Sequence, residues 1–291
     1  MRPLFERFRQ RGATAGYPVV AEPAPSIARG FPALDPALCR GHAACAASCP
    51  TGAIRVEDGA SGGWRWSLDL GRCVACGRCA EVCPTEALRI DPAYEFVYPR
   101  REDLVRSVTF QATWADPLPR PAEALRVRIH TIFGRSLHIR HLDVGSDNGA
   151  DWEMATLLGP VYDVQRLGID FVASPRHADM LLVTGAVSRN LAPALTHTYE
   201  ATPEPRLVVA LGTDACGGGI TQGSYAAAGG VDRVIPVDYY IPGDPPRPQA
   251  IIHGLLVALG RRVAVAATRD RVVAIPGPQG GGRTWKGSPS G

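Results

Sequence analysis

The sequence predicts two unlike parts: an α+β module rich in cysteine over residues 39–92, and an α/β domain with a mainly parallel sheet over residues 125–268. Two observations predict this division. Seven of the eight cysteines lie between Cys39 and Cys83. From about residue 125, strand-like and helix-like segments alternate, and such alternation forms a largely parallel sheet covered on both faces. A length of 291 residues is enough for two domains.

The composition is that of an ordinary folded protein, with 45% hydrophobic and 20% charged residues. No apolar run approaches the roughly 18 residues that cross a bilayer, so we expect no direct membrane span. Residues 1–11 lack the apolar core of a signal peptide, so we expect the chain to stay in the cytoplasm. A formal charge of +3 is too small to indicate a nucleic-acid partner. Eight cysteines in an unexported chain indicate metal binding before disulfides.

Three further segments flank or join these parts. Residues 1–38 contain several prolines and an apolar trio at Leu4, Phe5 and Phe8, and we interpret them as an N-terminal arm that packs on its own chain or on a partner. Residues 93–124 are rich in proline and mixed charge and are predicted to be a linker. Residues 269–291 have few apolar side chains and are predicted to be a disordered tail.

The α/β domain is predicted from the periodicity of its apolar residues. Alternating or continuous apolar runs predict strands, and apolar residues at helical spacing predict helices between them. The predicted strands are 136–144, 169–173, 178–183, 207–211 and 234–239, and the predicted helices are 151–167, 191–199 and 251–259.

The second cysteine run has the spacing C-x-x-C-x-x-C-x-x-x-C-P at Cys73, Cys76, Cys79 and Cys83. This is the ligand spacing of bacterial ferredoxins, in which three close thiolates bind one 4Fe–4S cluster and the fourth reaches the other cluster. A zinc ribbon usually shows two separated C-x-x-C pairs. The run therefore predicts iron–sulfur clusters, with Cys49 completing the set of Cys73, Cys76 and Cys79.

The first run keeps the same register at Cys39, Cys45 and Cys49, but His42 occupies the second ligand position. By the crossed pattern, Cys39, Cys45 and Cys83 hold the other cluster, with His42 as the candidate fourth ligand. A neutral imidazole in place of a thiolate should raise the potential of that cluster. The alternatives are that His42 swings away and leaves a 3Fe–4S cluster, or that solvent fills the fourth position.

Residues 39–90, with the following D-P-A-Y-E-F at 91–96, resemble the polyferredoxin subunits of formate hydrogenlyase and related energy-converting NiFe hydrogenases. Those subunits are similar in turn to the two-cluster subunit of respiratory complex I. The resemblance implies a ferredoxin-like module with two 4Fe–4S clusters.

In the α/β domain, four loops follow predicted strands at residues 145–150, 184–186, 212–216 and 242–246. Open α/β sheets present functional loops at the carboxyl ends of their strands. Asp147, Asp214 and Asp244 therefore have the right places to converge on one pocket. Three carboxylates there would bind a hard divalent cation, or each would instead accept hydrogen bonds from nearby backbone amides.

The same domain resembles the small subunit of energy-converting hydrogenases and the 20 kDa subunit of complex I, which carries the terminal cluster before quinone. The resemblance spans about residues 136–260 and implies a flavodoxin-like fold. It rests on motifs in order at 173–179 (A-S-P-R-H-A-D), 184–190 (T-G-A-V-S-R-N), 203–206 (P-E-P-R), 235–238 (I-P-V-D) and 241–246 (I-P-G-D-P-P).

In those families the loops hold a 4Fe–4S cluster through four cysteines. Here Asp147, Ala150, Asp214 and Asp244 stand at the four cysteine positions, and we call these four residues the vacated site. Gly149 stands at the alternative first-loop position that complex I uses. Cys216 lies two residues past the expected position. We therefore predict that the domain binds no third cluster, with oxygen ligation by the aspartates as the alternative. Glu153, Arg176 and His177 are expected beside the vacated site, where they would form an interface.

The sequence shows no nucleophile–base pair, phosphate-binding glycine loop or nicotinamide fingerprint, so any catalytic centre is expected on another chain. It predicts an iron–sulfur electron-transfer subunit of a membrane-associated complex. By resemblance, the partners are a hydrogenase large-subunit-like or complex I 49 kDa-like subunit and membrane subunits. They would hold the chain at the inner face of the cell membrane. The alternatives are a structural adaptor whose ferredoxin module serves another acceptor, and a divalent-metal site at the three aspartates.

Overall fold

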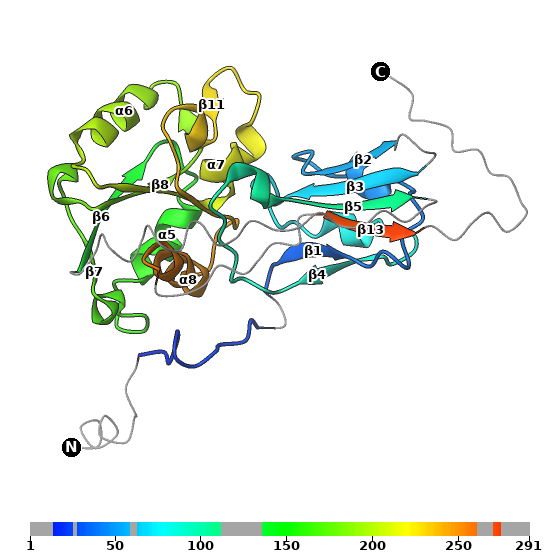
Figure 1. Ribbon diagram of the computed structural model, residues 1–291, viewed down its shortest axis with the longest axis horizontal. Coiled ribbons are helices and arrows are strands. Elements are labelled where there is room, and N and C mark those ends of the chain that lie inside the picture. Colours follow the sequence, from blue (N-terminus) through cyan, green and yellow to red (C-terminus); the bar gives the residue numbers. More distant parts are fainter. Residues whose placement is uncertain (1–13, 26–27, 59–62, 112–135, 261–269, 275–291) are drawn as a thin grey trace, which may run out of the picture.

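The computed structural model describes residues 14–25, 28–58, 63–111, 136–260 and 270–274. Figure 1 shows two lobes side by side, one formed by the cysteine module and one by the α/β domain. Leu4, Phe5 and Phe8 lie outside the described residues. No helix in the described part of the chain is long and apolar enough to cross a membrane.

The cysteine module is an α+β fold with an internal repeat. β1 (Phe31–Leu34) pairs antiparallel with β4 (Leu88–Asp91), and β2 (Ile54–Asp58) pairs antiparallel with β3 (Trp64–Asp69). Each cysteine run contains a short helix, α2 (Ala44–Ala47) or α3 (Arg78–Glu81). The residues before these helices, Ala43 and Gly77, are both left-handed, with φ of 56° and 79°. Matching backbone at matching sequence positions gives the two runs the same shape.

Two segments outside the predicted module add strands to it. In the predicted linker, η1 (Arg101–Leu104) leads into β5 (Val105–Gln111), which pairs antiparallel with β3 and buries Val108 and Phe110 on one face. In the predicted disordered tail, β13 (Asp270–Ala274) pairs parallel with β5. The sheet order is β13-β5-β3-β2, so the module includes residues that local composition did not assign to it.

The α/β domain contains a five-stranded parallel sheet in the order β12-β10-β8-β6-β7, which confirms the predicted class. Residues of β8 alternate between two cores: Leu181 and Val183 pack with Leu195 of α6, while Met180 and Leu182 pack with the wholly buried α8. Figure 1 shows α6 on one side of the sheet and α5 and α8 on the other. The strands are β6 (Leu137–Asp143), β7 (Ile169–Phe171), β8 (Met180–Thr184), β10 (Leu207–Leu211) and β12 (Tyr239–Ile241); the helices are α5 (Gly149–Thr156), α6 (Ala192–Ala201), α7 (Gly212–Gly217) and α8 (Pro248–Ala258).

Two predicted elements of this domain differ from the structure. The helix predicted at 151–167 stops at Thr156, because Gly159 and Pro160 interrupt it, and only the 3-10 turn η2 (Val164–Leu167) follows. The strand predicted at 234–239 is wrong except at Tyr239. Pro236 has no N–H to donate to a sheet, and the chain before it forms η5 (Val231–Arg233). Shorter elements at the domain edge are η3 (Pro175–His177), β9 (Val187–Ser188), η4 (Gly219–Thr221) and β11 (Ala227–Gly229).

The two lobes share an interface built from backbone and buried polar contacts. Tyr98 and Tyr240 exchange two backbone hydrogen bonds of 2.8 and 2.9 Å. On the module side, Arg101 binds both carboxylate oxygens of Asp69 at 2.9 and 2.7 Å, and its guanidinium lies beside Gly217 of α7. One buried apolar cluster includes Leu70 and Leu104 of the module together with residues of the parallel sheet. The segment predicted as a linker is therefore part of the joint between the lobes.

Candidate metal centres

The first cavity of the cysteine module is lined by Cys39, His42, Cys45 and Cys83. These are the four residues that the sequence assigned to one cluster. The cavity encloses about 350 Å³, including the part open to solvent. Its walls are apolar and include Trp64, Trp66, Leu34, Val56 and Leu88.

The second cavity, of about 320 Å³, is lined by the other predicted set of Cys49, Cys73, Cys76 and Cys79. Cys49 comes from the first run but lies with the second, and Cys83 does the reverse. The repeat explains this exchange, because the last cysteine of each run lines the cavity that is formed by the first three ligand positions of the other run. The two cavities thus separate the eight predicted residues into the two sets expected from the sequence.

Burial and mutual repulsion oppose the charge of the thiols in the second cavity. Burial raises the pKa of Cys73 to about 12, and neighbouring Cys79, Cys49 and Cys76 add to the effect. Burial raises the pKa of Cys79 to about 11, with further contributions from Cys45, Cys76 and Cys49. Cys73 and Cys79 therefore resist deprotonation, and a cationic centre would stabilise both as thiolates. The donor set therefore fits an iron–sulfur cluster.

The last cysteine of each run has the opposite character. Burial raises the pKa of Cys49, but hydrogen bonds outweigh it and the net pKa is lowered. The Ala53 N–H donates to Cys49 Sγ at 3.2 Å, and the Thr51 hydroxyl lies 3.7 Å from the same sulfur. Cys83 also has a lowered pKa, and the Thr85 hydroxyl lies 3.7 Å from its sulfur. Backbone and threonine donors at matching places thus favour both thiolates.

His42 occupies the place in the first run that Cys76 has in the second. Both side chains are exposed. The residues before them, Gly41 and Ala75, are both left-handed, with φ of 72° and 48°. The imidazole is therefore carried by the same backbone shape that carries a thiol at the opposite cavity.

The loops of the vacated site lie together at the carboxyl edge of the sheet. A Cβ added to Gly212 would lie 3.3 Å from Ala150 and 3.7 Å from the carbonyl oxygen of Gly243. Burial, followed by the charges of Asp147 and Asp244, raises the pKa of Asp214 to about 6. The pKa of Asp244 is also raised, by burial and then by Asp147, although Arg29 opposes this. The three aspartates therefore do converge, as the topology predicted.

Convergence does not bring the carboxylates close enough to bind one ion. Within the described ranges, no group of three or more His, Cys, Asp or Glu residues, the aspartates and the cysteine sets alike, has the geometry to hold a single metal ion. Burial is the largest cause of the raised pKa of Asp214, and repulsion from Asp147 and Asp244 adds to it. The divalent-cation alternative thus has no geometric support here.

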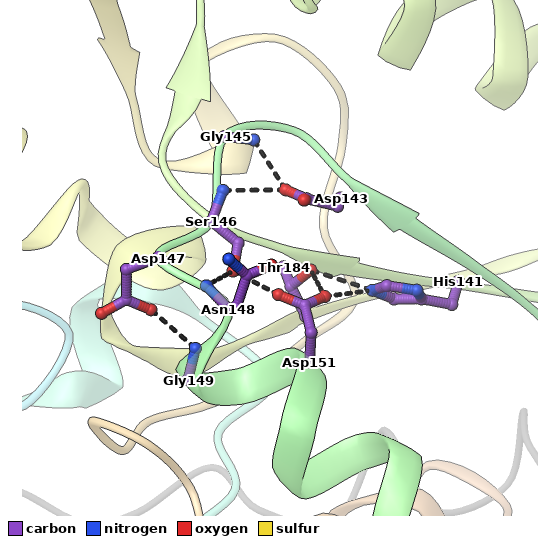
Figure 2. Close-up of polar contacts among 9 residues, drawn as sticks. All are labelled: His141, Asp143, Gly145, Ser146, Asp147, Asn148, Gly149, Asp151 and Thr184. Carbon is purple, nitrogen blue, oxygen red and sulfur yellow. Dashed lines mark hydrogen bonds and ion pairs between the residues drawn. The ribbon is translucent and has the colours of Figure 1, made fainter.

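Hydrogen bonds within the chain hold the first loop of the vacated site (Figure 2). Asp143 Oδ1 accepts the N–H groups of Gly145 and Ser146, both at 2.8 Å, and Asp147 Oδ1 accepts that of Gly149 at 2.8 Å. The backbone-capping role expected of the aspartates is therefore present at Asp147. Among the residues described, no such bond is found for the side chains of Asp214 and Asp244.

Behind this loop lies a partly buried network that the sequence did not reveal. Asp151 accepts a hydrogen bond from the hydroxyl of Thr184 at 2.7 Å and another from the hydroxyl of Ser146 (Figure 2). His141 Nε2 lies 2.8 Å from Asp151 Oδ1 and 2.9 Å from Thr184 Oγ1. Burial lowers the pKa of His141, and the charge of Asp151 opposes that effect. The network ties β6, β8 and α5 together, so the loop keeps its shape through the protein's own contacts.

Two of the three neighbours predicted for the vacated site, Arg176 and His177, lie elsewhere. Arg176 and His177 are exposed in η3, which precedes β8 and so lies at the opposite edge of the sheet; their predicted place beside the site is wrong. Glu153 lies on α5, where burial raises its pKa and the charge of Arg247 opposes the shift. Cys216 is wholly buried on α7, with its sulfur 3.5 Å from the carbonyl oxygen of Ala210.

The vacated site adjoins the second cavity. The Thr213 hydroxyl, next to Asp214, donates a buried hydrogen bond of 3.1 Å to the carbonyl oxygen of Cys73. On the far end of the same helix, α7, Gly217 lies so close to Gly71 that an added Cβ would overlap the carbonyl oxygen of Gly71. The α/β domain therefore approaches the module at the loop that begins the second cysteine run.

Two family models match the chain. Residues 36–87 match the 4Fe-4S dicluster domain, and residues 148–258 match the 20 Kd subunit of NADH ubiquinone oxidoreductase. The ferredoxin-type module inferred from cysteine spacing is thus confirmed as a 4Fe–4S domain, and the α/β domain as one related to complex I.

Three similar proteins place these domains among known complexes. The probable membrane-bound hydrogenase subunit mbhJ of Pyrococcus furiosus is 46% identical over 44% of this chain and 76% of its own length. Formate hydrogenlyase subunit 7 of Escherichia coli is 41% identical over 43% of this chain and 49% of its own length. A subunit of the NADH-quinone oxidoreductase of Desulfovibrio desulfuricans is 52% identical over 33% of this chain and 51% of its own length. The chain thus spans about half the length of the last two relatives.

Proposed function

The chain belongs to the family of the 20 Kd subunit of NADH ubiquinone oxidoreductase, and from this premise we propose that it is an iron–sulfur electron-transfer subunit of a membrane-associated oxidoreductase complex. The relatives named above are subunits of a membrane-bound hydrogenase, a formate hydrogenlyase and an NADH-quinone oxidoreductase. This chain adds a 4Fe–4S dicluster domain at residues 36–87. Its task in such a complex is to carry electrons one at a time.

The observation that carries the proposal is the pair of cavities in the cysteine module. The first holds one cluster through Cys39, His42, Cys45 and Cys83, and the second holds another through Cys49, Cys73, Cys76 and Cys79. The support is that each cavity is lined by one complete set. When bound, the clusters supply reversible one-electron reduction, and the protein supplies ligands, apolar walls and hydrogen-bond donors.

The first cluster has His42 as its fourth ligand in this proposal. The support is the matching backbone and exposure of His42 and Cys76. A 3Fe–4S cluster, with His42 turned to solvent, is the competing outcome.

The α/β domain carries no third cluster in this proposal. Asp147, Ala150, Asp214 and Asp244 provide no thiolate, and Cys216 is wholly enclosed on α7. The loop network around Asp151 supports this interpretation, because it holds the first loop without a bound group. The domain therefore acts as a docking and structural unit.

The proposed partners are a hydrogenase large-subunit-like or complex I 49 kDa-like subunit and membrane subunits, which place the chain at the inner face of the cell membrane. The names of the relatives support the class of complex. The exposed Trp152 on α5, with 73% of its surface accessible, supports a protein contact next to the vacated site, as do Leu158 and Val161 in the following turn.

Metal analysis of the full chain, purified without oxygen, tests the proposal. We expect about eight iron atoms per chain, four for each cubane, and two reducible signals by electron paramagnetic resonance. About twelve iron atoms per chain would refute the prediction that the vacated site binds no cluster. Zinc in place of iron would refute the electron-transfer function. Affinity purification from the native host tests the partners, and a large-subunit-like chain in the complex is the expected result.

A further inference from the structure

Trp66 lies at the centre of β3, on the face that walls the first cavity. In the sheet register it stands between Val56 of β2 and Val108 of β5. Only 3% of its surface is exposed, and it lines the cavity together with Cys45. The indole is therefore part of the enclosure of the first cluster site.

The indole N–H of Trp66 has no acceptor in the described part of the chain, where its Nε1 is fully shielded from solvent. Buried donors of this kind nearly always have a partner, because leaving one without an acceptor costs its whole desolvation energy. Cys45 lines the same cavity as Trp66, so sulfur at this site is the candidate acceptor.

Trp64 provides an internal contrast in the same wall. It stacks on Phe110, with ring centroids 3.6 Å apart and planes 15° from parallel, and it also packs beside Gly41. Packing accounts for its position. Trp66 has the same residue type and lines the same cavity, but its polar atom remains unexplained by contacts within the described chain. The lining of the second cavity includes no indole.

We propose that the Trp66 indole N–H donates a hydrogen bond to a sulfur atom of the first cluster, either of Cys45 or of the cluster itself, and raises the reduction potential of that cluster. This inference rests on the proposed function. Reduction adds one electron and moves no proton, so the cluster becomes more negative. A fixed donor that points at its sulfur stabilises the more negative form. Trp66 is thus a tuning residue and not a ligand.

Potentiometric titration of the full chain with its clusters in place tests this role. Trp66→Phe keeps an aromatic ring and removes the donor, and Trp64→Phe is the matched control in the same wall. We expect the midpoint potential of the first cluster to fall further in Trp66→Phe than in Trp64→Phe, while that of the second cluster stays close to the parent value in both variants. Equal shifts in the two variants, or no shift in Trp66→Phe, would overturn the inference.

A second measurement needs no Trp66 variant and covers the case in which Trp66→Phe loses its first cluster. The protein is labelled with tryptophan carrying ¹⁵N at the indole nitrogen only, and the reduced first cluster is examined by pulsed electron paramagnetic resonance. A ¹⁵N coupling on that cluster, retained in Trp64→Phe, is expected. If both clusters are intact and the coupling is absent, the role proposed for Trp66 is refuted while the proposed function stands. An iron content below that of two clusters would refute the proposed function itself, which keeps the two failures distinct.

Discussion

Replacing Asp214 by Asn should stabilise the folded protein at neutral pH and leave it unchanged in acid. Burial and the charges of Asp147 and Asp244 raise the pKa of Asp214 from 3.8 to about 6 in the folded state. The folded state therefore holds this proton more tightly than the unfolded chain does. The resulting stability is fully present below pH 3.8 and is lost as the pH rises through 6. At neutral pH the charged carboxylate destabilises the fold, and an amide removes that charge.

The size of the effect follows from the shift. At about 1.36 kcal/mol for each pKa unit, a rise from 3.8 to about 6 corresponds to at most about 3 kcal/mol. Asp214 is only partly buried, and water screens its repulsion from the other two aspartates. We therefore expect a gain of about 1–2 kcal/mol, or roughly 3–6 °C in Tm.

The assay is anaerobic thermal melting of the full chain with clusters bound, at fixed scan rate, from about pH 5 to about pH 8, a window that spans the raised pKa of Asp214. The difference in Tm between Asp214→Asn and the parent should be largest at the alkaline end and shrink toward the acidic end. Asp58→Asn, at the exposed end of β2, is the control and should show no such trend. A Tm that falls in Asp214→Asn at every pH would refute the reasoning, because it would show that the charged carboxylate makes a stabilising contact.

Three further outcomes follow from the site. His42→Cys should lower the potential of the first cluster by adding a negative ligand and leave the second unchanged; redox titration checks this, and unchanged potentials would show that His42 is not a ligand. Below the raised pKa of Asp214, where Asp147 no longer faces a charged Asp214, Asp147→Ala should lower Tm by about 2–4 °C, since a loop N–H loses an acceptor worth about 1 kcal/mol, while both cluster signals stay. Gly217→Ala should destabilise the joint between the lobes by about 1–3 kcal/mol, because its Cβ meets the Gly71 carbonyl; melting that matches the parent would contradict this.

The local features of the chain were predictable because they depend on spacing. Three of the four ligands of a cluster come from residues three positions apart, so C-x-x-C-x-x-C identifies a wall of the second cavity without knowledge of the fold. The exchange of Cys49 and Cys83 between the runs was also predicted, and the cavity linings agree with it. The parallel sheet followed from alternating elements, and the convergence of Asp147, Asp214 and Asp244 followed from the rule for strand ends.

The features that were missed depend on contacts between distant segments. β13 pairs with β5 although the two strands lie far apart in the chain, and the short apolar run at 272–274 does not by itself indicate that pairing. The misplacement of Arg176 has a topological cause, since it precedes β8 and therefore lies at the amino edge of the sheet. The Asp151 network joins three elements through His141 and Thr184, which have no motif spacing in common.

From the surroundings of the two cavities we expect the two proposed clusters to have unequal potentials. The first cavity has a neutral imidazole among its four proposed ligands and the Trp66 donor in its wall, and both favour the reduced form. The second has four thiols and lies next to Asp214, whose charge disfavours added electrons. The cavities adjoin, since Cys45 is among the residues that raise the pKa of Cys79. We therefore expect an electron delivered to the module to rest on the first cluster. A redox titration in which the second cluster is reduced first would contradict this order.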